Sequence, residues 1–209
     1  TVFETLIEIP NLFKNKKRSE SKRVGIVTTT GGGGAMVVES LSGSDIEIID
    51  SGLSIKKIMQ DNNIAFNNNK LVDLTIAGTK PEIVNEVISQ MMKNENCDLV
   101  VMVVGSSAKF RPEQAVEPLL KWANYPKPLA VYVAPDAPEA LNLLHQNNIA
   151  CFRTPESCAE SVKTFLNTKN PVKTTNLKNN LSDISKNLKK NICKNLSEKE
   201  ALEIFKDIG

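Results

Sequence analysis

The chain has 209 residues, of which 41% are hydrophobic and 24% are charged, and its formal net charge is only +2. This length and balance are typical of a globular protein with one domain and some appended segments. The longest apolar run, at 99–104, is far shorter than the roughly 20 residues that cross a bilayer, and no signal segment opens the chain, so we expect a cytoplasmic protein without a membrane partner.

Positive charge gathers in two segments outside the apolar part of the chain. Residues 14–23 and 169–195 together carry 13 Lys or Arg against 2 Asp or Glu, whereas residues 24–168 carry 11 against 16. The basic segments lack interleaved aromatic side chains, so we interpret them as solvated linkers and expect no nucleic-acid partner. Residues 1–22 form an N-terminal helix or linker on this interpretation. Because the chain opens on Thr1 rather than on Met, we expect it to be cut from a longer polypeptide.

Between residues 23 and 166, short β-branched runs alternate with helical patterns, which is typical of parallel βαβ units. The runs predict five strands, at 24–28, 46–50, 99–104, 129–133 and 149–152. The outer two runs are taken as less apolar, which predicts that they form the edges of the sheet. We therefore expect an α/β fold at 23–168, a three-layer, flavodoxin-like, doubly wound sheet of about five mostly parallel strands, followed by a C-terminal linker and helix.

Several helix starts are marked by capping patterns. Thr79 and Asp136 are each followed three residues later by Glu, as in a capping box. Thr154 precedes Pro155, a residue suited to the first helical position. Pro118 interrupts a later helical pattern, where we expect a kink or a restart.

The periodic pattern dissolves after residue 166 and returns near the end of the chain. Residues 169–195 are rich in Asn, Lys and Thr, which predicts a linker. Ser197 and Glu200 then form a capping-box pattern ahead of an apolar helical stripe. A helix this short cannot fold alone, so we expect residues 196–209 to open a further domain.

Four consecutive glycines follow the first predicted strand and precede the first predicted helix. Because glycine has no Cβ, a ligand can approach the backbone amides closely, and the helix dipole, worth about half a unit charge, favours a phosphate there. The alternative is that the glycines only let the helix pack closely on the strand. The predicted phosphate-binding residues are Gly31, Gly32, Gly33, Gly34 and Ala35, with Thr30 as a further ligand or loop contact.

Other cofactor motifs fit this turn poorly. No Gly-Lys-Ser/Thr follows the glycines, which excludes a Walker A loop, and Met36 stands where the dinucleotide fingerprint needs a third Gly or Ala. Asp50 lies near the ribose-binding position of that fingerprint, which leaves a nicotinamide cofactor as a weak alternative. A flavin is also a weak alternative, since the first turn lacks the hydroxyl-rich loop that a flavin phosphate typically needs.

The chain is poorly supplied with nucleophiles and bases, and we predict no catalytic residue and no metal site in it. Its only histidine, His145, lies late in a predicted helix, where a surface role is favoured. Ser106 and Ser107 follow the central strand, where parallel sheets bind ligands, so they either contact a ligand or form a turn. Asp73 is a polar residue in an apolar segment, expected to fix a loop or, alternatively, to contact a ligand.

Two arginines and the cysteines complete the candidates. Arg111 and Arg153 could contact an anion or a partner domain, although surface roles are commoner. The cysteines lack the paired short spacings of a zinc site and do not suggest a disulfide framework. We interpret them as buried small apolar residues: Cys97, Cys151, Cys158 and Cys193.

Four segments resemble the second flavodoxin-like module of NDP-forming acyl-CoA synthetases, the acetate-CoA ligase (ADP-forming) relatives of succinyl-CoA synthetase. They are 23–35 (RVGIVTTTGGGGA), 72–75 (VDLT), 127–128 (KP) and 148–156 (NIACFRTPE). They follow one another in the order found in that family. Residues 196–201 (LSEKEA) resemble the opening of the family's ATP-grasp domain, so the resemblance implies that 196–209 is the start of a truncated ATP-grasp domain.

The resemblance implies a parent acid-thiol ligase that joins a carboxylic acid to CoA through an acyl phosphate and a phosphohistidine. That parent would use ATP or ADP, Mg and CoA, with no cofactor bound by this chain itself. Gly31 to Gly34 would open a helix facing the phosphohistidine, whose Ser-His-Thr-Gly motif belongs to another module and does not occur here. The partners would be the CoA-binding, phosphohistidine and ATP-grasp modules, and a homo-oligomer stays open. Lys70-Leu71 and Glu39 depart from the family's usual Asn-Pro and Asp, which leaves open a non-catalytic scaffold or regulatory domain in a synthetase-like paralogue.

Overall fold

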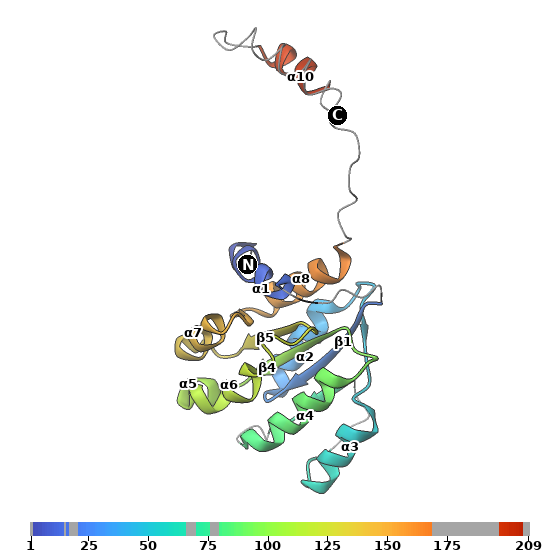
Figure 1. Cartoon of the computed structure of the whole chain (residues 1–209), viewed down its shortest axis with the longest axis vertical. Coiled ribbons are helices and arrows are strands. Elements are labelled where there is room, and N and C mark those ends of the chain that lie inside the picture. The colour runs from blue at the N-terminus through green and yellow to red at the C-terminus, as the bar shows by residue number, and fades with distance from the viewer. Residues whose placement is uncertain are drawn as a thin grey trace. The chain divides into compact units, whose positions relative to one another are not determined.

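The computed structural model describes residues 2–14, 16, 21–65, 70–75, 80–168 and 197–206. By their contacts the residues fall into two compact units, Thr1–Thr168 and Lys169–Gly209. The first unit contains an open parallel sheet between two helical layers, so the predicted three-layer, flavodoxin-like α/β fold is confirmed (Figure 1). In the second unit the described element is helix α10, Glu198–Lys206, and the predicted linker at 169–195 lies outside the described residues.

Six described strands form one sheet in the order β2-β1-β4-β5-β6, with β3 also paired to β1, and every pairing is parallel. The strands are β1 Arg23–Thr28, β2 Glu47–Ile48, β3 Leu71–Asp73, β4 Leu99–Val104, β5 Leu129–Val133 and β6 Ala150–Phe152. Strands β4 and β5 lie at the predicted residues, and β2 and β6 lie at the edges of the sheet. Strand β3 was not predicted, because three residues are too few to give a periodic signal.

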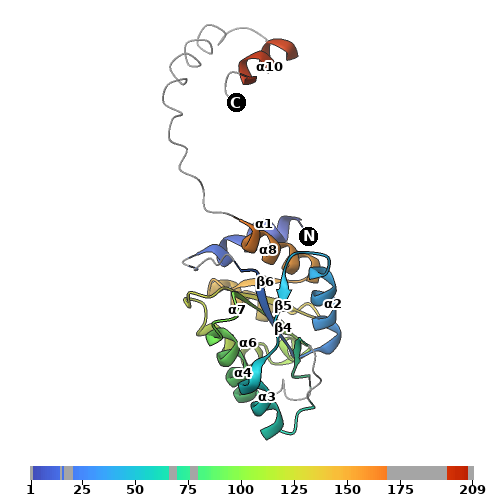
Figure 2. The same ribbon diagram turned by 90° about the vertical axis from the view of Figure 1, so that its right-hand side faces the viewer.

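Helices cover both faces of the sheet (Figure 2). Helices α2 and α8 pack on one face, and α3, α4, α6 and α7 pack on the other. Helix α1 packs against α8 and the edge strand β6, so residues 2–13 belong to the first unit. The helices of this unit are α1 Val2–Phe13, α2 Gly31–Leu41, α3 Gly52–Asp61, α4 Pro81–Lys93, α5 Ser107–Phe110, α6 Pro112–Leu120, α7 Pro138–Gln146 and α8 Pro155–Asn167.

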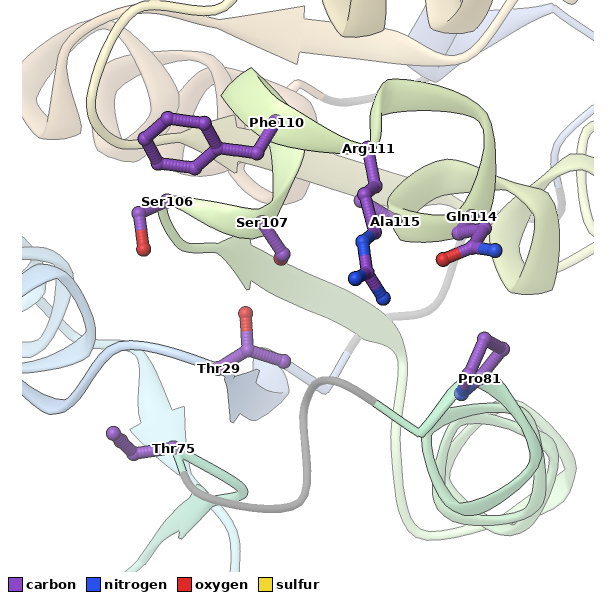
Figure 3. Close-up of a pocket in the computed structure, with 9 residues that line it drawn as sticks. All are labelled: Thr29, Thr75, Pro81, Ser106, Ser107, Phe110, Arg111, Gln114 and Ala115. Carbon is purple, nitrogen blue, oxygen red and sulfur yellow. The ribbon is translucent and has the colours of Figure 1, made fainter.

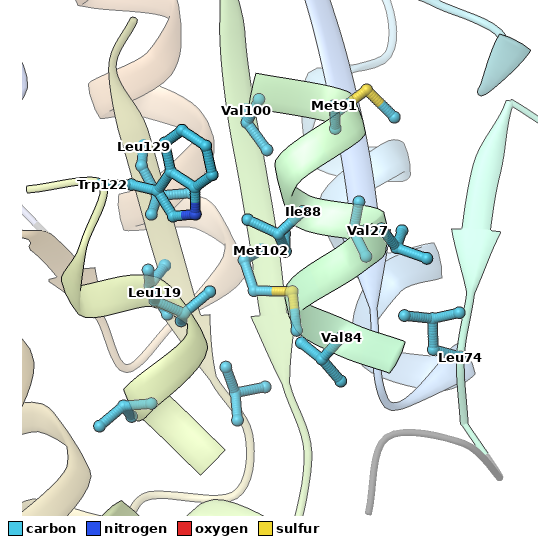
Figure 4. Packing of buried hydrophobic residues seen from close by; sticks show 14 of the residues in the cluster. Val27, Leu74, Val84, Ile88, Met91, Val100, Met102, Leu119, Trp122 and Leu129 are labelled. Carbon is cyan, nitrogen blue, oxygen red and sulfur yellow. The ribbon is translucent and has the colours of Figure 1, made fainter. Parts of the chain in front are cut away.

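Strand β4 is the centre of the core, because all six of its residues are buried. Its side chains alternate between the two faces, so Val100 and Met102 pack under α4 and α6, while Val101 and Val103 pack under α2 and α8. Figure 4 shows Ile88 of α4 beside Met102 in the first of these layers. Continuous apolar runs such as that of β4 thus have a physical cause, since helices cover the strand on both sides.

Proline decides where four of the helices begin. Helices α4, α6, α7 and α8 each have Pro at the first helical position, so the residue before that Pro is the N-cap. In α8 this residue is Thr154, whose hydroxyl accepts a hydrogen bond from the amide of Ser157 at 3.2 Å, as predicted. In α7 it is Ala137, so the predicted cap Asp136 lies one residue too early and instead pairs with Arg153 at 3.3 Å.

The other capping and proline predictions have mixed outcomes. The N-cap of α4 is Lys80, so the capping box predicted from Thr79 is wrong by one residue, and Thr79 itself lies outside the described residues. Helix α6 continues through Pro118 to Leu120 and does not restart there. The box at the start of α10 is confirmed, since the Ser197 amide donates to the Glu200 carboxylate at 2.8 Å.

The remaining sequence expectations concern the cysteines and helices that could span a membrane. Cys97, Cys151 and Cys158 are free and buried, as predicted, whereas Cys193 lies outside the described residues. No helix in the described part of the chain combines the length and the apolar character that a bilayer span requires.

Candidate functional site

The four glycines form the first turn of helix α2 rather than a loop ahead of it. The turn itself consists of Thr29 and Thr30, and Thr30 is the N-cap, with extended backbone angles and no capping bond from its side chain. The Thr28 hydroxyl at the end of β1 donates to the carbonyl of Thr30 at 2.7 Å and accepts from its amide at 3.0 Å. Strand β1 therefore leads directly into a helix whose N-cap residue supplies no side-chain acceptor to the first amides.

The structure gives different partners to the amides of this turn. The Gly34 amide donates to the carbonyl of Thr30 at 3.0 Å, and the Gly31 amide donates to the hydroxyl of Thr75 at 3.1 Å. The amides of Gly32 and Gly33 have no hydrogen-bond partner among the described residues. These two are thus the donors that a ligand could use, while Ala35 already lies within the regular helix.

Close packing explains two of the glycines. A Cβ on Gly34 would lie 2.8 Å from Thr28 Cγ2, and a Cβ on Gly33 would lie 2.9 Å from Thr30 Cγ2 and 3.0 Å from Val103 Cγ1. The packing interpretation therefore applies to Gly33 and Gly34. A Cβ on Gly32 would meet nothing within 4 Å, so packing does not require glycine there.

Strand β3 brings a second loop to the start of α2. Asp73 ends β3 beside Thr28, and its Oδ1 atom accepts hydrogen bonds from both the amide, at 2.9 Å, and the hydroxyl of Thr75. The Thr75 hydroxyl in turn accepts a hydrogen bond from the Gly31 amide. Asp73 thus fixes the loop that is bonded to the start of α2, as predicted. Sequence reasoning did not name Thr75 as a site residue, because strand β3, which leads into its loop, was not predicted.

A pocket of about 290 Å³ lies beside this loop, at the carboxyl ends of β1 and β4 (Figure 3). The chain continues from β1 to β2 on one side of this point and from β4 to β5 on the other. Open α/β sheets bind ligands where the strand order reverses in this way. The Thr29 hydroxyl accepts the amide of Gly105 at 2.9 Å and so ties the two strand ends together. The pocket is lined by Thr29, Thr75, Pro81, Ser106, Ser107, Phe110, Arg111, Gln114 and Ala115.

The predicted candidates Ser106, Ser107 and Arg111 all line this pocket. The Arg111 side chain extends from the start of α6 into the space opposite Thr29 (Figure 3). It forms no ion pair among the described residues. The lining is accordingly rich in hydroxyl groups and carries one cation, which suits a small anion.

Three other candidates lie away from the pocket. Nδ1 of His145 lies 3.1 Å from Glu8 Oε1, and Arg153 pairs with Asp136. Asp50 accepts the amide of Gly52 at 2.9 Å at the start of α3, and this hydrogen bond is the main reason that its pKa is lowered. The described residues contain no group of three His, Cys, Asp or Glu that could hold a metal ion.

Comparison with known proteins supports the fold. No family model and no curated protein matches the chain. Its fold is similar to that of PH0766 from Pyrococcus horikoshii OT3, with a TM-score of 0.67 and 18% identity over 78% of this chain and 39% of that chain. It is also similar to the dinucleotide forming acetyl-coenzyme A synthetase 1 of Ca. Korarchaeum cryptofilum, in complex with phosphate and ADP, with a TM-score of 0.62, and in the apo form, with 0.61. Both of these matches have 19% identity over 78% of this chain and 36% of that chain, so this chain spans less than two fifths of the proteins it resembles.

Proposed function

We propose that this chain is a module of an NDP-forming acyl-CoA synthetase, and that the start of α2 faces a phosphohistidine carried by another module. The fold similarity to an acetyl-coenzyme A synthetase described with phosphate and ADP supports this proposal. So do the family-like segments of the sequence, among them the glycines that open α2. The carrying observation is that the amides of Gly32 and Gly33, among the described residues, are left for a ligand at the end of a strand of the sheet.

In this role the chain would supply electrostatic stabilisation rather than bond making. The amides of Gly32 and Gly33 would donate to phosphoryl oxygens, and the dipole of α2 adds about half a unit of positive charge. The chain lacks the Ser-His-Thr-Gly motif, so the group that accepts the phosphate would come from another module. ATP or ADP, Mg and CoA would likewise bind elsewhere in the longer protein.

A second candidate is a non-catalytic scaffold or regulatory domain in a synthetase-like paralogue. One observation favours it. The Asp73 carboxylate lies beside the start of α2, since its Oδ2 atom is 2.8 Å from the position that a Gly31 Cβ would take. A carboxylate at this point already complements the helix dipole and repels an incoming phosphate.

Two measurements test the proposal. In an amide NMR titration of the chain with inorganic phosphate, we expect the Gly32 and Gly33 resonances to move first, because these are the available donors. In an assay with ATP, CoA and acetate, we expect no acetyl-CoA from this chain and turnover by the longer polypeptide. Turnover by the chain alone would contradict the proposal.

The scaffold candidate makes the opposite prediction for the longer polypeptide. A phosphohistidine, detected by labelling with γ-³²P-ATP, is expected only for the synthetase. If neither labelling nor acyl-CoA formation occurs, and phosphate leaves the α2 amides unmoved, the scaffold candidate is favoured.

A further inference from the structure

Arg111 is a cation without a counter-charge in the described part of the chain. The structure describes three arginines, and the other two each pair with a carboxylate at 3.3 Å, Arg23 with Asp98 and Arg153 with Asp136. Arg111 pairs with no described carboxylate, and no Asp or Glu is among the residues that line its pocket. Its guanidinium group is therefore available to an acidic ligand.

The backbone holds Arg111 at the junction of α5 and α6. Its amide donates to the carbonyl of Ser107 at 2.8 Å, and its carbonyl accepts the amide of Ala115 at 3.0 Å. Pro112 then fixes the start of α6 directly after it. The side chain thus extends from a fixed point, so less conformational freedom is lost on binding than for a residue in a loose loop.

Two hydroxyl groups of the same pocket also lack partners. The Thr29 and Thr75 hydroxyls both take part in hydrogen bonds within the protein. The side chains of Ser106 and Ser107, by contrast, have no hydrogen-bond partner among the described residues. Because both serines line the pocket, it offers a ligand two hydroxyl donors besides the positive charge of the arginine.

The charge of the pocket favours a carboxylate over a phosphate. A carboxylate carries one negative charge, which one guanidinium group balances, and the planar fork of arginine can donate two parallel hydrogen bonds to it. A phosphate group carries about 1.5 to 2 negative charges near neutral pH. The excess charge would lie near Asp73, whose carboxylate accepts the amide of the lining residue Thr75 at 2.9 Å.

An exposed aromatic ring gives the pocket an apolar side. Phe110 immediately precedes Arg111, lines the pocket and is 77% exposed. Pro81 and Ala115 add further apolar lining (Figure 3). The volume of about 290 Å³ is close to the lower limit of small-molecule sites, roughly 300–1,000 Å³. A two-carbon acid would fill only part of it, since a water molecule occupies roughly 30 Å³ of liquid.

We propose that Phe110 and Arg111 make this pocket selective for a monocarboxylic acid with an apolar tail of several carbons. Arg111 binds the carboxylate, Ser106 and Ser107 donate to it, and Phe110 packs against the tail. The Thr75 hydroxyl connects the pocket to the start of α2, because it also accepts the first amide of that helix. That this acid is the one joined to CoA rests on the proposed function.

The test is an NMR titration of the ¹⁵N-labelled 209-residue chain with acetate, butanoate and hexanoate. We expect all three acids to shift the amides of Ser106, Ser107 and Arg111 and the Nε–H signal of Arg111. Affinity should rise about fourfold for each methylene that the pocket buries, as for the transfer of a methylene from water to an apolar site. Butanoate is therefore expected to bind about tenfold more tightly than acetate.

Variants at the two residues separate affinity from selectivity. Phe110→Ala should leave acetate binding unchanged and reduce the preference for butanoate over acetate to below about fourfold, whereas Phe110→Leu should retain most of that preference. Arg111→Gln should weaken the binding of every acid by about tenfold without changing the preference. Both residues are exposed and lie outside the two buried clusters, so the variants keep the folded core.

Arg153→Gln is the matched control. Arg153 is also an exposed arginine, but it pairs with Asp136 and Glu4 and does not line the pocket. This variant is expected to bind all three acids as the unaltered chain does.

Three results would overturn the inference. Equal affinities for acetate and hexanoate would show that the pocket does not select an apolar tail. Acid binding that Arg111→Gln leaves unchanged would show that the carboxylate lies elsewhere. Inorganic phosphate that displaces butanoate from Ser106 and Ser107 at the same concentration would show a general anion site.

Failure of this inference can be told apart from failure of the proposed function. If the acids bind as expected but the longer polypeptide forms no acyl-CoA, the selectivity of the pocket holds and the synthetase proposal fails. If the longer polypeptide forms acyl-CoA while the acids leave Ser106 and Arg111 unmoved, the synthetase proposal holds and the selectivity fails.

Discussion

At the start of α2, four identical residues have four different surroundings. Gly33 lies against side chains of the β1–α2 turn and of β4, and Gly34 lies against side chains of β1 and β3. Gly31 lies beside Asp73, and Gly32 lies in open space. The repeated glycine therefore has no single cause. Of the four, Gly32 is the one at which an added Cβ would meet nothing within 4 Å, so binding can be tested there separately from packing.

Alanine substitutions at Gly32 and Gly34 should have opposite effects on stability. Gly34→Ala forces a Cβ against the buried Thr28 and should lower the free energy of unfolding by about 1–3 kcal/mol, measured by urea denaturation. Gly32→Ala should raise it by about 0.4–1 kcal/mol, because alanine restricts the unfolded chain. The same Gly32→Ala change should weaken phosphate binding, since a helical Cβ tilts towards the N-terminus that the ligand approaches. Phosphate affinity that is equal in Gly32→Ala and in the unaltered chain would contradict an anion site at this turn.

The Cys151 thiol should be inert in the folded chain. Burial, and then the negative charge of Glu8, raise its pKa to about 12. An unfolded cysteine has a pKa of about 8.5, so the fold favours the protonated thiol. Its contribution to stability is present in full below pH about 8.5 and is lost as the pH rises towards 12. Iodoacetamide at pH about 8.5 should therefore label Cys151 only in urea, as read by mass spectrometry, and equal labelling without urea would refute the buried thiol.

At the scale of elements, the junctions between strands and helices carry most of the specificity. In α4, α6, α7 and α8 the first residue is a proline, which fixes the cap at the residue before it. Thr154 stands in that position, and its side chain accepts a hydrogen bond from an amide of the first turn. Asp136 stands one residue earlier, and its side chain pairs with Arg153 instead. The register of the cap therefore follows the proline and not the capping-box spacing.

This rule predicts a loss and a gain of stability at two caps. Thr154→Ala removes the acceptor of the Ser157 amide and should cost about 1 kcal/mol. Lys80→Ser supplies an acceptor at the exposed, extended N-cap of α4 and should contribute about 1 kcal/mol. Asp136→Ala is the control, with a change below about 0.5 kcal/mol, because it lies outside the cap and only removes an exposed ion pair. Thermal unfolding checks all three, and a larger loss for Asp136→Ala than for Thr154→Ala would contradict the rule.

Sequence reasoning succeeded where a pattern had one physical cause. Strands β4 and β5 could be predicted because continuous apolar runs form when helices cover both faces. Strand β3 could not, because three residues are too few to show an alternating period. Thr75 was missed for the same reason, although its hydroxyl accepts a hydrogen bond from the amide of Gly31, the first residue of α2. Placing that loop depends on contacts between residues 44 positions apart, which local patterns do not encode.

At the scale of the whole molecule, the chain divides at residue 168. Every residue of the two buried apolar clusters lies at or before Leu166. The last turn of α8 is closed within the first unit, because the Thr168 amide donates to the carbonyl of Thr164 at 3.0 Å. All the groups that build the pocket and the start of α2 belong to the same unit.

A chain that ends at Thr168 should therefore fold on its own. We expect one cooperative unfolding transition by calorimetry, with a Tm within about 2 °C of that of the 209-residue chain, because both apolar clusters are retained. It should also give the same phosphate-induced shifts at Gly32 and Gly33. A peptide of residues 197–209 is the complementary sample. Its capping box closes the first turn, but nine helical residues are too few for stable helix in water, so its circular dichroism should show mostly unfolded chain. A drop of more than about 8 °C in the Tm of the shortened chain, equivalent to roughly 2 kcal/mol for a domain of this size, would show that residues after 168 contribute to the stability of the α/β domain.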